Sequence, residues 1–256
     1  MKVFLFTRRS FVSLAVGLLA GVLLLCVSVT GVSNARETAG SQRKIPIYCV
    51  DREEKVASLS FDAAWGNEDT EELIEILARY NVRVTFFVVG DWVEKYPESV
   101  KALSEAGHEI QNHSDSHPHL TQLSREQMMG EIRACNEKIQ AITGVCPTLL
   151  RAPYGDYNNT VVEVMKEMGM YTIQWDVDSL DGKGLSGQEI YQRVTSRVKN
   201  GSIVLFHNAA EHTPEALGDI IAKLQKDGFS LVPISELIHE GVYFGDHEGR
   251  QHAGGV

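Results

Sequence analysis

Basic residues are few in this 256-residue chain, and their shortage limits the partners it can bind. Lys and Arg number 24 against 34 Asp and Glu, a formal charge of −10. Four of the basic residues lie within residues 1–36, which contain no acid, so residues 37–256 hold 20 basic against 34 acidic groups, or −14. Nucleic-acid phosphates are bound by patches of Lys and Arg, and the sequence has no such patch. The composition therefore argues against nucleic acid as a partner.

Two further absences narrow the chemistry. No G-x-G-x-x-G or G-x-x-x-x-G-K-[ST] motif follows a predicted strand, so the phosphate loop of the usual nucleotide-binding sheets is missing. The chain has four cysteines and no C-x-x-C spacing. Cys135 and Cys146 are close enough in sequence to be bridged, but buried free thiols are common, and unpaired thiols are the interpretation that we favour.

A long uncharged segment lies near the N-terminus. Residues 11–32 carry no charge and follow three basic residues. A helix of this length rises about 1.5 Å per residue and can cross a hydrocarbon core of ~30 Å. Its positively charged leading end should stay on the cytoplasmic side. We predict an extracytoplasmic protein, either anchored to the membrane by residues 1–36 or secreted after cleavage near Ser33-Asn34-Ala35.

The rest of the chain is typical of one α/β domain. We expect a linker and lead-in segment at residues 37–54, the domain at 55–240 and a C-terminal tail at 241–256. Apolar periodicity and turn residues predict strands that alternate with helices. The predicted strands are 56–61, 82–89, 109–112, 148–150, 171–175, 202–206 and 229–232. The predicted helices begin at Asn67, which opens a helix reaching Tyr80, and continue with 97–106, 124–144, 159–168, 187–199 and 214–227.

Strands that alternate with helices pair in parallel, either as an open doubly wound sheet or as a closed or nearly closed barrel. Polar side chains favour the barrel. They follow five different strands, as Asp62, His113, Arg151, Asp178 and His207. Side chains after the carboxyl ends of five strands converge most simply when the strands form a ring.

These residue types also suggest a chemistry. His113, His117 and His119 lie within seven residues, and neutral imidazole is a good ligand for Zn²⁺. Each polar residue has an ordinary structural explanation, such as a helix-capping role for Asp62 or a buried, hydrogen-bonded ring for His207. Taken together, a pair of metal ligands, a carboxylate, an arginine and a further histidine are the components of metal-assisted hydrolysis.

Five segments in order carry a family resemblance. They are Ser60-Phe61-Asp62-Ala63, His113-Ser114-Asp115-Ser116-His117-Pro118, Arg151-Ala152-Pro153-Tyr154-Gly155, Asp178-Ser179-Leu180-Asp181 and Val204-Leu205-Phe206-His207. Together they resemble the motifs of the polysaccharide deacetylases with NodB homology, also called carbohydrate esterase family 4. The apolar N-terminal segment and Pro46-Ile47-Tyr48 look most like the sporulation-associated members of that family.

The resemblance implies a distorted (β/α)7 barrel that removes N-acetyl groups from cell-wall amino sugars such as those of peptidoglycan. It implies that His113 and His117 bind a divalent ion, usually zinc, whose bound water attacks the amide. The protein would then act on peptidoglycan or another N-acetylated glycan outside the cytoplasm, with the spore envelope as one location.

The resemblance also implies roles for the other motif residues. Asp62 corresponds to the general base, and Arg151 holds its carboxylate. His207 corresponds to the general acid, and Asp181 is the matching residue to orient its ring. In the Pro153-Tyr154 bend, the backbone N–H of Tyr154 helps to stabilise the oxyanion.

The sequence departs from the family pattern at two positions. Ala63 stands where the family has an Asp that is the third metal ligand, and Gly182 stands where a Trp usually follows the fourth motif. A catalytic zinc typically has three protein ligands, so the loss of one puts metal affinity and activity in question. The alternatives are a catalytically weakened barrel that binds glycan as a structural or regulatory protein, or an esterase acting on O-acetyl groups or a deacetylase acting on a chitin-type oligomer.

Overall fold

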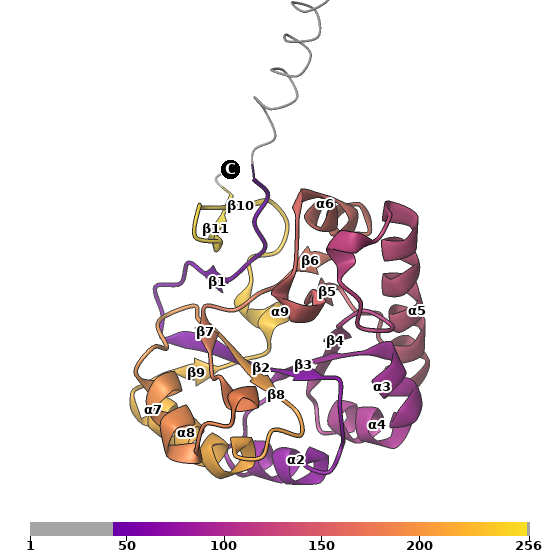
Figure 1. The fold of residues 1–256 in the computed structure, drawn as a ribbon. Helices are drawn as coiled ribbons and strands as arrows, with labels where there is room; N and C mark the ends of the chain where they lie inside the picture. Colours follow the sequence, from indigo (N-terminus) through magenta and orange to yellow (C-terminus); the bar gives the residue numbers. More distant parts are fainter. Residues whose placement is uncertain (1–42, 255–256) are drawn as a thin grey trace, which may run out of the picture. The chain divides into compact units, whose positions relative to one another are not determined.

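A computed structural model describes residues 43–254 of the chain, and residues from Lys44 onward cluster as one compact unit (Figure 1). The strands are β1 (Cys49–Val50), β2 (Val56–Ala63), β3 (Thr85–Val88), β4 (Glu109–Asn112), β5 (Leu149–Leu150), β6 (Tyr171–Thr172), β7 (Val177–Asp178), β8 (Ile203–His207), β9 (Ser230–Leu231), β10 (Tyr243–Gly245) and β11 (Arg250–Ala253). The α-helices are α2 (Thr70–Arg79), α3 (Gly90–Lys95), α4 (Pro97–Glu105), α5 (Arg125–Thr143), α6 (Asn159–Glu167), α7 (Gly187–Thr195), α8 (Thr213–Lys226) and α9 (Ile234–Leu237). Short 3₁₀ turns are η1 (Leu120–Gln122), η2 (Pro153–Gly155) and η3 (Asp181–Lys183).

The main sheet is parallel and curls into a distorted (β/α)7 barrel, as the sequence predicts. Its strand order is β6-β5-β4-β3-β2-β8-β7, and β9 pairs with the beginning of β2. Strand β2 lies at the centre, between β3 and β8. Because all these strands run in the same direction, their carboxyl ends meet at one edge of the sheet.

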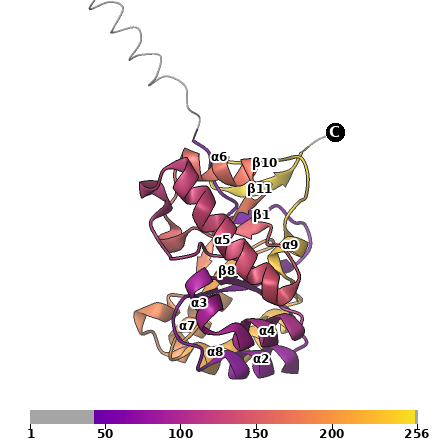
Figure 2. The same ribbon diagram turned by 90° about the vertical axis from the view of Figure 1, so that its right-hand side faces the viewer.

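Apolar side chains hold the helices against the outside of the sheet. The rings of Phe86, Phe61 and Phe206, on β3, β2 and β8, form a stacked row, with centroids 4.9 and 5.3 Å apart. They join a large buried cluster to which α2 contributes Leu73 and Leu77. Helices α3, α4 and α5 pack together on the side of the domain that faces the viewer in Figure 2. Helices α2 and α8 pack together at the bottom of that view.

Local signals predicted the long helix well. Ser124 and Gln127 form a capping box at the start of α5, with side-chain and backbone groups bonded reciprocally. At its end Gly144 has a φ of 74°, a left-handed conformation that glycine adopts without strain.

Several predicted boundaries differ from the structure, and long-range hydrogen bonds accompany two of the differences. The helix expected to open at Asn67 begins at Thr70, because the side chain of Asn67 instead donates to Ser99 Oγ at 3.0 Å. The strand expected over 171–175 ends at Thr172, and the unpredicted β7 follows it. Residues after β6 bond to the lead-in segment, since the N–H of Gln174 donates to the carbonyl of Ile47 at 2.7 Å.

A small second sheet joins the two ends of the compact unit. Its order is β1-β11-β10, so a strand from the lead-in segment pairs in parallel with one from the C-terminal segment. The three described cysteines, Cys49, Cys135 and Cys146, are free thiols. Among residues 43–254, no helix combines the length and apolar character needed to cross a bilayer. The apolar segment at residues 11–32 lies outside the described residues.

Candidate active site

Asp62 lies near the end of β2, on the face opposite to the packed phenylalanines. Side chains alternate between the two faces of a strand. Phe61 therefore points into the apolar cluster, whereas Ser60 and Asp62 point to the inside of the barrel, and both are buried. The Asp62 carboxylate is therefore shielded from water, and a buried charge of this kind needs a partner.

Arg151 supplies that partner from just beyond β5. Its guanidinium is fully buried, and Nη1 donates to Asp62 Oδ1 at 2.8 Å while Nη2 donates to Ser60 Oγ at 2.8 Å. The guanidinium also lies 4.2 Å from the ring centroid of Phe87. Burial is the largest single influence and by itself would raise the pKa of Asp62, but the neighbouring positive groups, first among them Arg151 with its charge and hydrogen bond, together outweigh it, so the pKa of Asp62 is lowered. Asp62 is therefore a buried, ionised carboxylate.

His113 follows β4 and has its ring orientation fixed. Nδ1 lies 2.7 Å from the carbonyl oxygen of Arg151, and because a carbonyl only accepts, Nδ1 carries the proton. Nε2 then holds the lone pair, and it lies 3.6 Å from Asp62 Oδ2. Burial lowers the pKa of His113 and keeps the ring neutral. This is the arrangement that positions a histidine as a metal ligand.

A tight loop brings His117 beside His113. Its φ is 58°, and its N–H donates to Ser114 Oγ at 3.1 Å. The rings of His113 and His117 have centroids 4.9 Å apart. Burial, together with the neighbouring His113, lowers the pKa of His117 to about 4, so this ring is neutral as well. Two neutral imidazoles are thus brought together, as metal ligands must be.

A third ligand is not in place. Within residues 43–254, no three His, Cys, Asp or Glu side chains are grouped so that they could hold an ion. Ala63 is buried in the apolar cluster. Two other nearby donors are engaged elsewhere, since Asp115 pairs with Lys138 at 2.9 Å and His119 with Asp156 at 3.1 Å. Imidazole nitrogens are suitable ligands for a divalent ion, but the site offers two of them where a catalytic zinc usually has three protein ligands.

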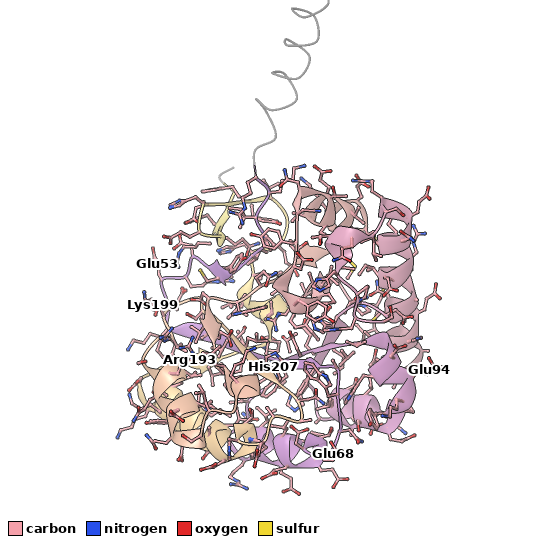
Figure 3. All side chains as sticks on the ribbon, in the orientation of Figure 1. Glu53, Glu68, Glu94, Arg193, Lys199 and His207 are labelled. Atoms are coloured by element: carbon pink, nitrogen blue, oxygen red, sulfur yellow. The ribbon has the colours of Figure 1, made fainter. Side chains whose placement is uncertain are left out.

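His207, labelled in Figure 3, ends β8 and is the register partner of Asp62 on β2. Its Nδ1 lies 2.8 Å from Asp181 Oδ1, and its N–H donates to Asp181 Oδ2 at 2.8 Å. Thr213 Oγ1 donates to the same carboxylate at 2.7 Å. Burial alone would lower the pKa of His207, but the hydrogen bond and charge of Asp181 outweigh it and raise the pKa. His207 is therefore placed to carry a proton.

The bend after Arg151 adds an exposed ring beside the two histidines. Pro153 is buried, while Tyr154 is exposed and has a φ of 61°. The Tyr154 ring centroid lies 4.6 Å from that of His117 and 4.2 Å from that of His119. Asp178, by contrast, has a structural role at the end of β7, where its Oδ1 accepts a hydrogen bond from the N–H of Leu180 at 2.8 Å.

Several supporting residues were not predicted from the sequence. Ser60 bonds Arg151, and Thr213 bonds Asp181. Asn112 Oδ1 accepts from the N–H of Ser114 at 2.7 Å, and Glu131 accepts from the backbone after it. The alternation of polar and apolar residues along β2 could have identified Ser60. The others come from distant elements, and no local signal marks them.

Comparisons with known proteins agree with this geometry. The family model described as polysaccharide deacetylase matches residues 50–173. The peptidoglycan-N-acetylmuramic acid deacetylase PdaA of Bacillus subtilis is 33% identical over 198 residues, which cover 75% of each chain. This chain belongs to the polysaccharide deacetylase family. PdaC of the same organism, also described as a peptidoglycan-N-acetylmuramic acid deacetylase, is 36% identical over 73% of this deacetylase-family chain and 40% of its own.

A solved structure adds a different kind of relative. BA3943 from Bacillus anthracis, described as a CE4 family pseudoenzyme, superimposes on this polysaccharide deacetylase with a TM-score of 0.73 and 32% identity, over 82% of this chain and 73% of that one. A mutant of the same protein is described as having restored enzymatic activity. The chain spans 40% to 61% of the length of the first curated relatives that it matches. The relatives of this chain therefore include both proteins described as deacetylases and one described as a pseudoenzyme.

Proposed function

We propose that residues 55–240 of this protein hydrolyse N-acetyl groups on cell-wall amino sugars, with peptidoglycan as the substrate. One observation carries the proposal. Asp62 and His207 are register partners on adjacent strands, and their pKa values move in opposite directions, Asp62 lowered and His207 raised. A carboxylate with a lowered pKa beside an imidazole with a raised pKa is the pairing that a base and an acid need.

The two residues match the two proton transfers of amide hydrolysis. A water molecule adds to the acetyl carbonyl, and Asp62 accepts the proton that the water loses. The C–N bond then breaks, and His207 donates its proton to the departing nitrogen, which leaves as a free amine while the acetyl group leaves as acetate. An amine is a poor leaving group unless it is protonated, so a histidine with a raised pKa suits an amide.

The remaining site residues orient this pair. Arg151 fixes the Asp62 carboxylate, and Asp181 fixes the His207 ring. His113 and His117 would hold a divalent ion, with Zn²⁺ the best match to two imidazoles. Such an ion would polarise the carbonyl and lower the pKa of water. The Pro153-Tyr154 bend would present a backbone N–H to the oxyanion.

The proposed location follows from the substrate and from the N-terminal segment. Peptidoglycan lies outside the cytoplasmic membrane, and residues 1–36 have the composition of an anchor or a signal peptide. We include the spore envelope in the proposal on the strength of the sequence resemblance. The names of PdaA and PdaC support a peptidoglycan substrate.

The decisive experiment is acetate release from N-acetylated peptidoglycan by the purified chain, with added Zn²⁺ and with a chelator. We expect release that needs the ion. Asp62→Asn should reduce the rate by about 10²- to 10⁴-fold, with zinc content unchanged. Asp219→Asn, at an exposed position on α8, is the matched control. If Asp62→Asn also loses zinc, Asp62 is a metal ligand instead of the base.

A second candidate is a glycan-binding barrel with little or no turnover. Ala63 and the likeness to the BA3943 pseudoenzyme favour it. Folded protein that binds peptidoglycan but releases no acetate with any divalent ion would support this alternative and reject hydrolysis. An O-acetyl esterase would release acetate as well. It would differ in depending little on His207, because an alcohol leaves more readily than an amine.

A further inference from the structure

We propose that the Trp65 indole is the surface on which the face of the N-acetylated sugar stacks, next to the proton donor His207. The inference deepens the proposed function and rests on it. Trp65 follows β2, three residues after Asp62. Its ring centroid lies 6.0 Å from that of His207 and 6.3 Å from that of His117. The indole therefore adjoins both halves of the candidate site.

Exposure distinguishes this ring from the other two tryptophans. Trp65 is 57% exposed, whereas Trp92 is 2% exposed and Trp175 is half-buried under the Arg151 guanidinium. Large aromatic rings normally bury most of their surface, so an exposed ring beside the polar groups of the site offers an apolar face that a ligand can cover. Tyr154, whose ring also lies beside His117, is 62% exposed. Two exposed rings, Trp65 and Tyr154, thus lie beside the polar side chains of the candidate site.

The chemistry of the two rings suits a sugar. One face of a pyranose presents C–H bonds, and its edge presents hydroxyl groups. The face of an indole is the negative part of its quadrupole and packs favourably against such C–H groups. The polar side chains of His207 and His117 lie next to the Trp65 ring, where the hydroxyl and amide groups of a stacked sugar would meet them. A purely apolar ligand would leave these groups without partners.

The loop that carries Trp65 is held firmly in place. The N–H of Ala64 donates to Asn208 Oδ1 at 3.2 Å, and the carbonyl of Gly66 accepts from the indole N–H of Trp92 at 3.0 Å and from the amide of Asn208. Asn208 is buried and directly follows His207. Contacts on both sides of Trp65 therefore tie it to the strand end that supplies the acid. A surface fixed before binding loses little conformational entropy when the ligand arrives.

Gly182 lies close to His207 and places no side chain against its ring. A Cβ at residue 182 would lie 3.7 Å from His207 Nδ1, so any larger side chain there would begin against the ring. Glycine provides no such side chain. Trp65 is thus the aromatic side chain that borders His207, and we assign sugar stacking at the acid to it.

Acrylamide quenching of tryptophan fluorescence tests this assignment without turnover. The probe is the tetramer of N-acetylglucosamine, added to the full chain. Since Trp65 is the most exposed of the three tryptophans, we expect the tetramer to protect the protein from quenching. Trp65→Ala should raise the Kd for the tetramer by about three- to tenfold, and Trp65→Phe should raise it less. Phe244→Ala, an exposed aromatic on β10, should leave the Kd unchanged.

The outcomes separate this inference from the proposed hydrolysis. If no acetate is released but the tetramer still protects Trp65, the hydrolysis proposal fails and the stacking assignment stands. If acetate is released, and the tetramer binds without changing the quenching, the stacking assignment is wrong. The quenching measurement uses the unaltered protein, so it decides the question even if Trp65→Ala does not fold. In the active protein we expect Trp65→Ala to raise KM more than it lowers kcat.

Discussion

The two halves of the candidate site differ in how completely they are built. The proton-transfer half consists of Asp62 with Arg151 and His207 with Asp181, and each pair is joined at 2.8 Å. The proposed metal-binding half has two neutral imidazoles, His113 and His117, and Ala63 at the position where the family resemblance places a third ligand. One half has every component that its chemistry requires, and the other does not.

The contrast shows which energetic constraint acts on each half. A buried charge without a partner costs several kcal/mol, so Asp62 and Arg151 depend on each other for stability as well as function. An imidazole is neutral and tolerates the absence of a metal at little cost to the fold. The metal-binding half can therefore lose a ligand without unfolding the barrel, while the proton-transfer half cannot lose one partner so easily. Four predictions test this comparison.

The largest effect is expected for Arg151→Met. The substitution leaves the Asp62 carboxylate buried and unpaired, which should lower the free energy of unfolding by about 3–5 kcal/mol. Urea denaturation measures this loss. Asp62→Asn combined with Arg151→Met should lose less than Arg151→Met alone, because no charge is then left without a partner. Arg133→Met, exposed on α5, is the control. Equal stability of Arg151→Met and the control would refute the constraint.

The next effect concerns the acid. Asp181 holds the pKa of His207 above its ordinary value, against the effect of burial. Asp181→Asn removes that charge, so the pKa falls and His207 loses its proton at lower pH. We expect the alkaline limb of kcat/KM to move to lower pH and the rate above that limb to fall, by about 10²-fold where the acid is lost. An unmoved alkaline limb would mean that another group sets it.

A gain of function should follow from rebuilding the metal-binding half. Ala63→Asp puts a carboxylate at the position that the family resemblance assigns to the third metal ligand, and we expect it to tighten zinc binding by about tenfold or more, since even the loss of an outer-shell partner of a metal ligand changes affinity by that much. Without zinc the buried carboxylate should lower the melting temperature, and zinc should raise it again. Ala63→Asn has the same size and no charge, and should do neither. Equal zinc affinity in both variants would show that position 63 does not face the ion.

The smallest effect is expected at a support for the histidine loop. Glu131 on α5 accepts hydrogen bonds from the N–H groups of Asp115 and Ser116, at 3.1 and 2.9 Å. Glu131→Gln should weaken this support and raise the Kd for zinc by up to about tenfold, as measured by titration calorimetry. Glu137→Gln lies on an exposed part of the same helix and is the control. The same Kd in both variants would show that the loop keeps its shape unaided.

Helix ends could be predicted from the sequence because they are set by interactions between residues close together in the chain. The capping box at Ser124 and the left-handed Gly144 bound α5 as predicted, since caps depend on residues within one turn. The parallel strands were predicted from their apolar runs, and the curled barrel from polar residues after five strand ends. Where pairing partners come from far along the chain, the prediction was wrong or silent. Strand β7 was unpredicted, and the pairing of β1 with β11 joins residues 201 positions apart.

The site shows the same division. The sequence by itself determined which chemical groups are available, and the five motifs indicated which of them belong together. It also determined what is missing, because a methyl group at Ala63 cannot bind a metal in any fold. Only the tertiary structure decided that Arg151 pairs with Asp62 across 89 residues, that Asp62 and His207 are register partners, and that Trp65 borders His207. Burial and register are properties of the whole sheet, so the pKa values and contacts that they set cannot be obtained from any segment alone.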